Sequence, residues 1–131
     1  MMKNKEIIVA INAMNRIIDK KDVKIAYEIR RAIRKNHPVF MEEYNIMDEE
    51  RKRLASSISD VKVEELSVEE HNEFNIKKKA VEQEIMNLLE KEVDIEVVKV
   101  SECFLRESEL SLAEEMALEF MLEPDEMGGE M

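Results

Sequence analysis

A cluster of four basic side chains lies between residues 30 and 35, shortly before Pro38. Its members are Arg30, Arg31, Arg34 and Lys35. Guanidinium groups bind carboxylates and phosphates through paired hydrogen bonds, so the cluster has the chemistry to dock an acidic protein surface or to contact a nucleic acid. It also has the composition of a solvated helix end, because cations near a helix C-terminus complement the helix dipole by about 0.3–1 kcal/mol each. The residues alone leave these three interpretations open.

Other residues with catalytic or metal-binding chemistry are few. The only glycines lie in the last four residues, so the preceding chain lacks the glycine-rich loops that cradle nucleotide phosphates. Two histidines and one cysteine are too few for a structural zinc site. His71 stands in EEHNEF, which is not the HExxH pattern, and Cys103 is expected to be a half-buried free thiol rather than a nucleophile paired with a histidine. We therefore expect a protein that is not an enzyme and needs no cofactor and no metal.

Charge is distributed unevenly along the 131 residues. Residues 1–40 contain ten Lys/Arg and four Asp/Glu, whereas residues 41–131 contain ten Lys/Arg and 27 Asp/Glu, and the net charge is −11. Residues 101–131 hold ten acids against the single base Arg106. A field of this sign opposes the approach of a polyanion. We therefore expect a protein partner and no nucleic acid.

Apolar residues at helical spacing predict three helices in the first half of the chain. One follows Asn4 and a second follows Asp22, both of which are favoured N-cap residues. Pro38 disfavours helical geometry in the residue before it and suits the first turn of a new helix. A third helix is therefore expected over residues 38–58, separate from the helix that carries the basic cluster.

Two capping boxes, each a serine followed three residues later by a glutamate, predict helix starts in the second half. Ser67 with Glu70 opens a helix expected over residues 67–91, and Ser111 with Glu114 opens the last helix.

Residues 61–63 and 93–100 read as short strands, which are predicted to pair as a small two-stranded sheet. The expected fold class is α+β and mainly helical. It comprises a long antiparallel helical hairpin, 38–58 with 67–91, together with packed flanking helices and this sheet. Five apolar side chains are expected between the two long helices: Tyr44, Met47, Leu54, Ile85 and Leu88.

By its length the chain is one domain, expected over residues 1–123, with residues 124–131 as a flexible acidic tail. No apolar run approaches the roughly 18 residues of a membrane span. The apolar start is interrupted by Asn12, Asn15 and Arg16, unlike a signal peptide. The single cysteine fits a reducing compartment. We therefore expect a cytoplasmic protein that does not associate with membranes.

Four stretches carry a resemblance to a known family: IIVAINAMNRI, VKIAYEIRRAIRKNHPVFMEEYNIMDEERKRL, FNIKKKAVEQEIMNLLEKEVDIEVVKV and SLAEEMALEFMLE. In this order they resemble a family of small uncharacterised proteins encoded by tailed phages and prophages of Gram-positive bacteria. The resemblance covers residues 5–123 and includes no catalytic signature. It implies a phage protein made in the cytoplasm of the host cell, and it supplies no site residues.

The expected function is that of a non-enzymatic phage interaction protein, favoured as a virion-assembly or accessory protein. The alternative is an inhibitor of a host enzyme or defence system that acts through an acidic, DNA-mimicking surface.

The candidate docking residues are Arg30, Arg31, Arg34 and Lys35. Exposed ion pairs contribute only about 0–1 kcal/mol each to stability, whereas charges steer and orient association between molecules. The simplest acidic partner for the cluster is the 101–131 segment of a second copy, which would make the protein a homo-oligomer.

Folding should need no bound metal, because the chain offers too few cysteines and histidines for a structural site. The midpoint of thermal unfolding should therefore be the same with and without a chelator such as EDTA. A fall of many degrees on chelation would contradict this expectation.

Overall fold

The computed structural model describes residues 1–59 and 62–124 of the chain. Its helices are α1 (Asn4–Ile18), α2 (Tyr27–Ser59), α3 (Val68–Glu90) and α4 (Leu112–Ala117), with the short 3-10 helices η1 (Val63–Glu65), η2 (Glu102–Glu107) and η3 (Glu119–Met121). Its strands are β1 (Met2–Lys3), β2 (Glu92–Val93), β3 (Val100–Ser101) and β4 (Leu122–Glu123). The predicted class, α+β and mainly helical, is confirmed.

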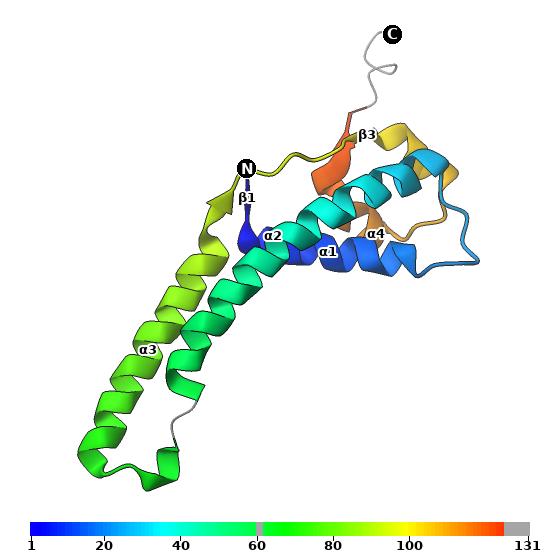
Figure 1. Cartoon of the computed structure of the whole chain (residues 1–131). Helices are drawn as coiled ribbons and strands as arrows, with labels where there is room; N and C mark the ends of the chain where they lie inside the picture. Colours follow the sequence, from blue (N-terminus) through cyan, green and yellow to red (C-terminus); the bar gives the residue numbers. More distant parts are fainter. Residues whose placement is uncertain (60–61, 125–131) are drawn as a thin grey trace.

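The longest elements, α2 and α3, form an antiparallel hairpin that projects from the rest of the molecule (Figure 1). We call residues 45–59 and 62–90 the stalk, and residues 4–44 and 94–124 the head. The predicted hairpin is confirmed. Among the helices of the described chain, none is long and apolar enough to cross a membrane.

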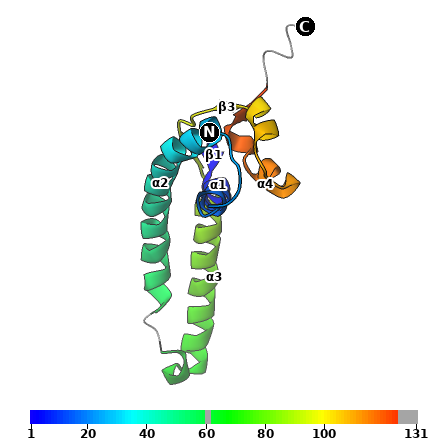
Figure 2. The same cartoon turned by 90° about the vertical axis from the view of Figure 1, so that its right-hand side faces the viewer.

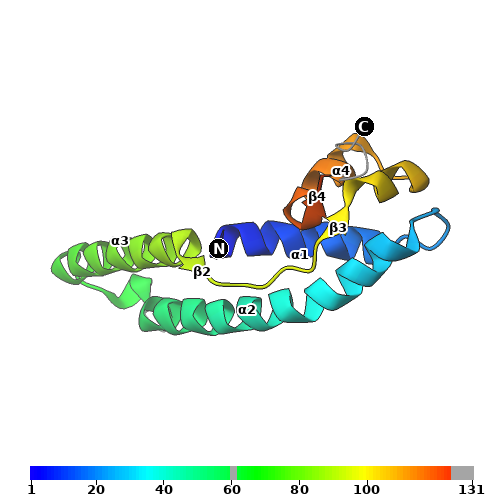
Figure 3. The same ribbon diagram turned by 90° about the horizontal axis from the view of Figure 1, so that it is seen from above.

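The head has three layers, in which α1 lies between α2 and α4 (Figures 2 and 3). Phe40 of α2 packs against Phe120 with ring centroids 5.3 Å apart. Full burial of a large apolar side chain contributes about 1.5–3 kcal/mol, so the shared core is the main source of stability in the head. The large apolar side chains of this core are Ile7, Ile11, Met14, Ile17, Ile25, Ile29, Ile33, Phe40, Val100, Leu118 and Met121.

The start of α1 meets the end of α3. The buried Asn4 side chain donates from Nδ2 to the carbonyl of Leu88 (2.8 Å), and its backbone N–H donates to the carbonyl of Lys91 (3.0 Å). The last carbonyls of a helix have no donors within that helix, and α1 supplies them here. The prediction that Asn4 caps this helix is wrong, because the N-cap is Lys3 and Asn4 is the first residue of α1. Beside it, β1 pairs antiparallel with β2.

Asn36 of α2 is 1% exposed and holds the segment that crosses the head. Its Oδ1 accepts from the N–H of Val98 at 2.7 Å, and its Nδ2 donates to the carbonyl of Val98 at 3.0 Å. One side chain thus bonds both backbone groups of Val98, as a neighbouring strand would. The segment leads into β3, which pairs in parallel with β4.

The beginning of α2 is fixed by a residue distant in sequence. Ser108 Oγ accepts from the backbone N–H of Ala26 (2.9 Å) and donates to the carbonyl of Phe104 (2.9 Å). The prediction that Asp22 caps this helix is wrong, because α2 begins only at Tyr27 and the bond at its start comes from the end of η2.

The predicted helix boundary at Pro38 is also wrong, because α2 runs through this residue and bends along its course (Figure 3). Proline costs a helix interior about 3 kcal/mol or more, since it lacks an N–H and crowds the carbonyl four residues earlier. The fully buried side chains of Ile33, Asn36 and Phe40 hold the helix on both sides of Pro38 in the core of the head. Tertiary packing therefore overrides the local preference.

The predicted pairing of residues 61–63 with 93–100 is wrong. Val61 lies outside the described residues, and Val63 begins η1. Within 93–100 only the two ends pair, at β2 with β1 and at β3 with β4. Residues 62 and 63 lie at the tip of the hairpin, so the length of α3, about 35 Å, separates them from the predicted partner.

Both capping boxes are confirmed. The N–H of Glu70 donates to Ser67 Oγ, and that of Glu114 to Ser111 Oγ, each at 3.2 Å. The last helix, α4, ends at Ala117. It is followed by η3 and by the extended β4, which pairs with β3.

Few apolar side chains are buried in the described stalk. Of the five side chains predicted between the long helices, Met47 is buried and Tyr44, Leu54, Ile85 and Leu88 are half-buried. A hairpin of two helices has a single interface, so side chains that flank the contact line stay partly in water.

Replacing Asn36 by alanine should lower the free energy of unfolding by about 1–3 kcal/mol, because the polar groups of Val98 lose their partners. Asn45→Ala is the matched control: Asn45 is exposed on the same helix and makes the same change in helix propensity. Urea unfolding measures both. Equal midpoints for the two variants would contradict the role given to Asn36.

Candidate protein-docking site

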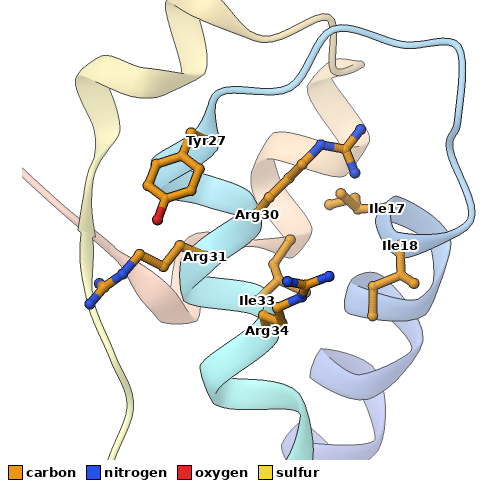
Figure 4. A pocket seen from close by; sticks show the side chains of 7 residues that line it. All are labelled: Ile17, Ile18, Tyr27, Arg30, Arg31, Ile33 and Arg34. Atoms are coloured by element: carbon orange, nitrogen blue, oxygen red, sulfur yellow. The ribbon is translucent and has the colours of Figure 1, made fainter.

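A hollow of about 410 Å³ opens where the end of α1 meets the first turns of α2 (Figure 4). Its α2 side carries Tyr27, Arg30, Arg31 and Arg34, which share one face because helical residues three or four apart are neighbours. The residues that line it are Ile17, Ile18, Tyr27, Arg30, Arg31, Ile33 and Arg34.

The floor of the hollow is apolar and its rim is cationic. Ile17 and Ile33 are almost fully buried beneath it, whereas Tyr27 is 71% exposed at its edge. Figure 4 shows the Arg34 guanidinium beside Ile33, whereas Arg30 extends toward the loop before α2 and Arg31 extends to the side of α2 away from Ile17 and Ile18. The exposed aliphatic surface of the hollow comes from Ile18, which is 47% exposed, and it lies near groups that bind carboxylates.

The three arginines are not equivalent. Arg30 is half-buried, and its Nη2 donates to the carbonyls of Lys20 (3.3 Å) and Val23 (3.4 Å) in the loop before α2. Arg31 and Arg34 are exposed. Arg30 thus fixes the loop, and the other two are free to meet a partner.

Lys35, the fourth predicted docking residue, is exposed one turn after Arg31 but does not line the hollow. The structure therefore brings three of the four predicted residues together. Sequence reasoning missed Tyr27 and the isoleucines, although the spacing of residues 27, 30, 31 and 34 marks a common helical face.

None of the four predicted residues forms an ion pair within residues 1–59 and 62–124. The interpretation of the cluster as a helix end is wrong, because α2 continues to Ser59 and the arginines lie in its first turns. Cations gain from the helix dipole only near the C-terminus. Neither a carboxylate in the described chain nor the dipole therefore accounts for this cluster.

Negative charge in the head gathers in residues 102–123. Lys20 pairs with Glu114 at 2.8 Å and so ties the end of α1 to the start of α4. Within the described part of the chain, the other glutamates of this region form no ion pair. They are Glu102, Glu107, Glu109, Glu115, Glu119 and Glu123.

The remaining candidates for chemistry stay apart. His37 Nε2 lies 2.9 Å from Asn15 Oδ1, and no hydrogen bond among the described residues joins Cys103 to His37 or His71. Within the same residues, no group of three or more His, Cys, Asp or Glu side chains is placed to hold a metal ion.

Comparison with protein-family models, with curated protein sequences and with solved structures finds no match to this chain.

The Lys20–Glu114 pair should make stability depend on pH. Hydrogen bonds from the Lys20 ammonium and from Ser111 lower the pKa of Glu114 from 4.5 to about 2. A carboxylate whose pKa is lower in the folded state stabilises the fold fully above pH 4.5, and this contribution disappears as the pH falls toward 2.

Urea unfolding of the wild type and of Glu114→Gln between neutral pH and pH 2 should therefore show a stability gap that is constant above about pH 5 and narrows below it. Glu115→Gln is the control, since Glu115 forms no ion pair in the described chain, and it should unfold like the wild type at neutral pH. A gap of constant size at every pH would contradict the assignment.

Proposed function

We propose that this chain is a non-enzymatic protein-interaction protein that docks an acidic segment of another protein in the hollow between α1 and α2. One observation carries the proposal: Arg31 and Arg34 stand exposed around an isoleucine floor, with no carboxylate partner in the described residues. Like charges held close together repel each other, so a cluster without an internal counterion is best explained by an external one.

The chemistry of the hollow defines the partner. Guanidinium groups pair with carboxylates through two parallel hydrogen bonds. The exposed Ile18, above the buried Ile17 and Ile33, suits an apolar side chain. The matching segment therefore has acidic residues beside an exposed aliphatic residue. The phosphate backbone of a nucleic acid has no aliphatic side chain, and the net charge of −11 opposes the approach of a polyanion.

For the biological setting, we propose a tailed phage or prophage of Gram-positive bacteria, with action in the host cytoplasm as a virion-assembly or accessory protein. The four stretches described above support this setting by their resemblance.

The second candidate function is inhibition of a host enzyme or defence system through an acidic, DNA-mimicking surface. The observation that favours it is the set of six glutamates in residues 102–123 that form no ion pair in the described chain.

The test compares the wild type with Arg31→Ser/Arg34→Ser in pull-downs from infected and uninfected host cells at low and high salt. Lys77→Ser/Lys79→Ser is the control, because these exposed lysines remove the same charge from α3 and form no ion pair in the described chain. Phage proteins bound by the wild type and the control should be lost with the arginine variant and at high salt.

Two results would overturn the proposal. Retention of the same proteins by all three forms would show that the arginines do not dock them. Tight, salt-sensitive binding of a duplex DNA probe that needs Arg31 and Arg34 would establish a nucleic-acid function instead.

A further inference from the structure

The head carries two surfaces of opposite charge on different sides. The hollow with Arg31 and Arg34 lies between α1 and α2, and α4 packs on the other flank of α1 (Figures 2 and 3). The contacts of α4 with α1 bring Ala117 next to Val9 and Ala13. The two surfaces therefore share no residue, and α4 of the same molecule does not occupy the hollow.

Exposed side chains of α4 and of the start of η3 have the chemistry that the hollow calls for. Leu112 is 73% exposed and Met116 is 64% exposed, one helical turn apart. Glu115 precedes Met116 and Glu119 follows it by three residues, and neither glutamate forms an ion pair within the described chain. This face thus presents aliphatic side chains beside carboxylates.

We propose that α4 of one copy docks in the hollow of the next copy, head to tail. Leu112 and Met116 lie on the isoleucine floor, and Glu115 and Glu119 pair with Arg31 and Arg34. The inference rests on the proposed docking function of the hollow and names its partner.

The separation of the two surfaces decides the symmetry of the assembly. A two-fold dimer would need both hollows to be filled at once across a single contact, which surfaces on different sides of the head do not allow. A head-to-tail contact instead leaves one hollow and one α4 face open on every pair. Such contacts close into a ring or extend as a filament.

The test uses two variants that each remove one surface without reversing its charge. Arg31→Ser/Arg34→Ser removes the basic surface, and Leu112→Ser/Glu115→Gln/Glu119→Gln removes the acidic one. All five residues have side chains that are at least partly exposed, and circular dichroism with urea unfolding verifies that both variants fold.

Analytical ultracentrifugation at low salt should show wild-type species larger than a dimer that grow with protein concentration and dissociate at high salt. Each variant alone should sediment as one chain. An equimolar mixture should form a complex of two chains and grow no further, because the variant without the basic surface still offers α4 and the other variant still offers its hollow. Lys77→Ser/Lys79→Ser should assemble like the wild type.

A wild-type protein that stays monomeric at every concentration would overturn the inference, as would variants that assemble alone or fail to pair when mixed. The pull-down tests the proposed function separately. If Arg31→Ser/Arg34→Ser still loses phage partners in the pull-down, the hollow docks another protein and only the head-to-tail contact is refuted.

Discussion

The amide of Asn36 is a polar group inside an apolar head, and its two bonds to Val98 set the register of the segment that crosses α2. Burying an amide without partners would cost several kcal/mol, so the pairing specifies one alignment. A slip by one residue would turn Val100 out of the core, because side chains alternate along an extended chain. The position of Val100 places β3 beside β4 and leads the chain into η2. There Ser108 bonds the start of α2, so the turns that carry the arginines depend on this crossing.

The continuity of α2 changes the meaning of its basic cluster. If the helix had ended before Pro38, cations in its last turn would have interacted favourably with the carbonyl end of the dipole. Because the helix continues along the stalk, the same residues stand near its beginning, where the helix dipole does not favour cations. Arg30 donates to the carbonyls of Lys20 and Val23 and so fixes the loop before α2. Arg31 and Arg34 remain as cations over an aliphatic floor, an arrangement suited to recognition more than to stability.

The capping boxes are the local signals that predicted local structure correctly. Ser67 with Glu70 and Ser111 with Glu114 form the capping boxes that their spacing indicates, because both partners lie within one turn. The helical hairpin was predictable for a similar reason, since two long amphipathic stretches joined by a short connection pack side by side.

Features that depend on residues distant in the sequence could not be predicted from it. Pro38 is accommodated because α1 and the crossing segment hold its flanks, and no local signal reports such support. β2 and β3 are two residues long, and the strands with which they pair, β1 and β4, lie far from them in the sequence. The basic residues were found from composition, but the hollow was not. It exists only because the end of α1 brings Ile17 and Ile18 against α2.

The proposed docking site and the part of the fold with the fewest buried apolar side chains lie at opposite ends of α2. The hollow uses its first turns, and a helix of 33 residues places the tip of the stalk about 50 Å away. In the described stalk, Met47 and Val81 are the apolar side chains that are fully buried, whereas the head has a continuous aliphatic core. Local opening costs least where few apolar contacts must break, so the stalk opens before the head does. The arginines are anchored in the head by the buried Ile29 and Ile33 beside them, and such opening therefore leaves the geometry of the hollow unchanged.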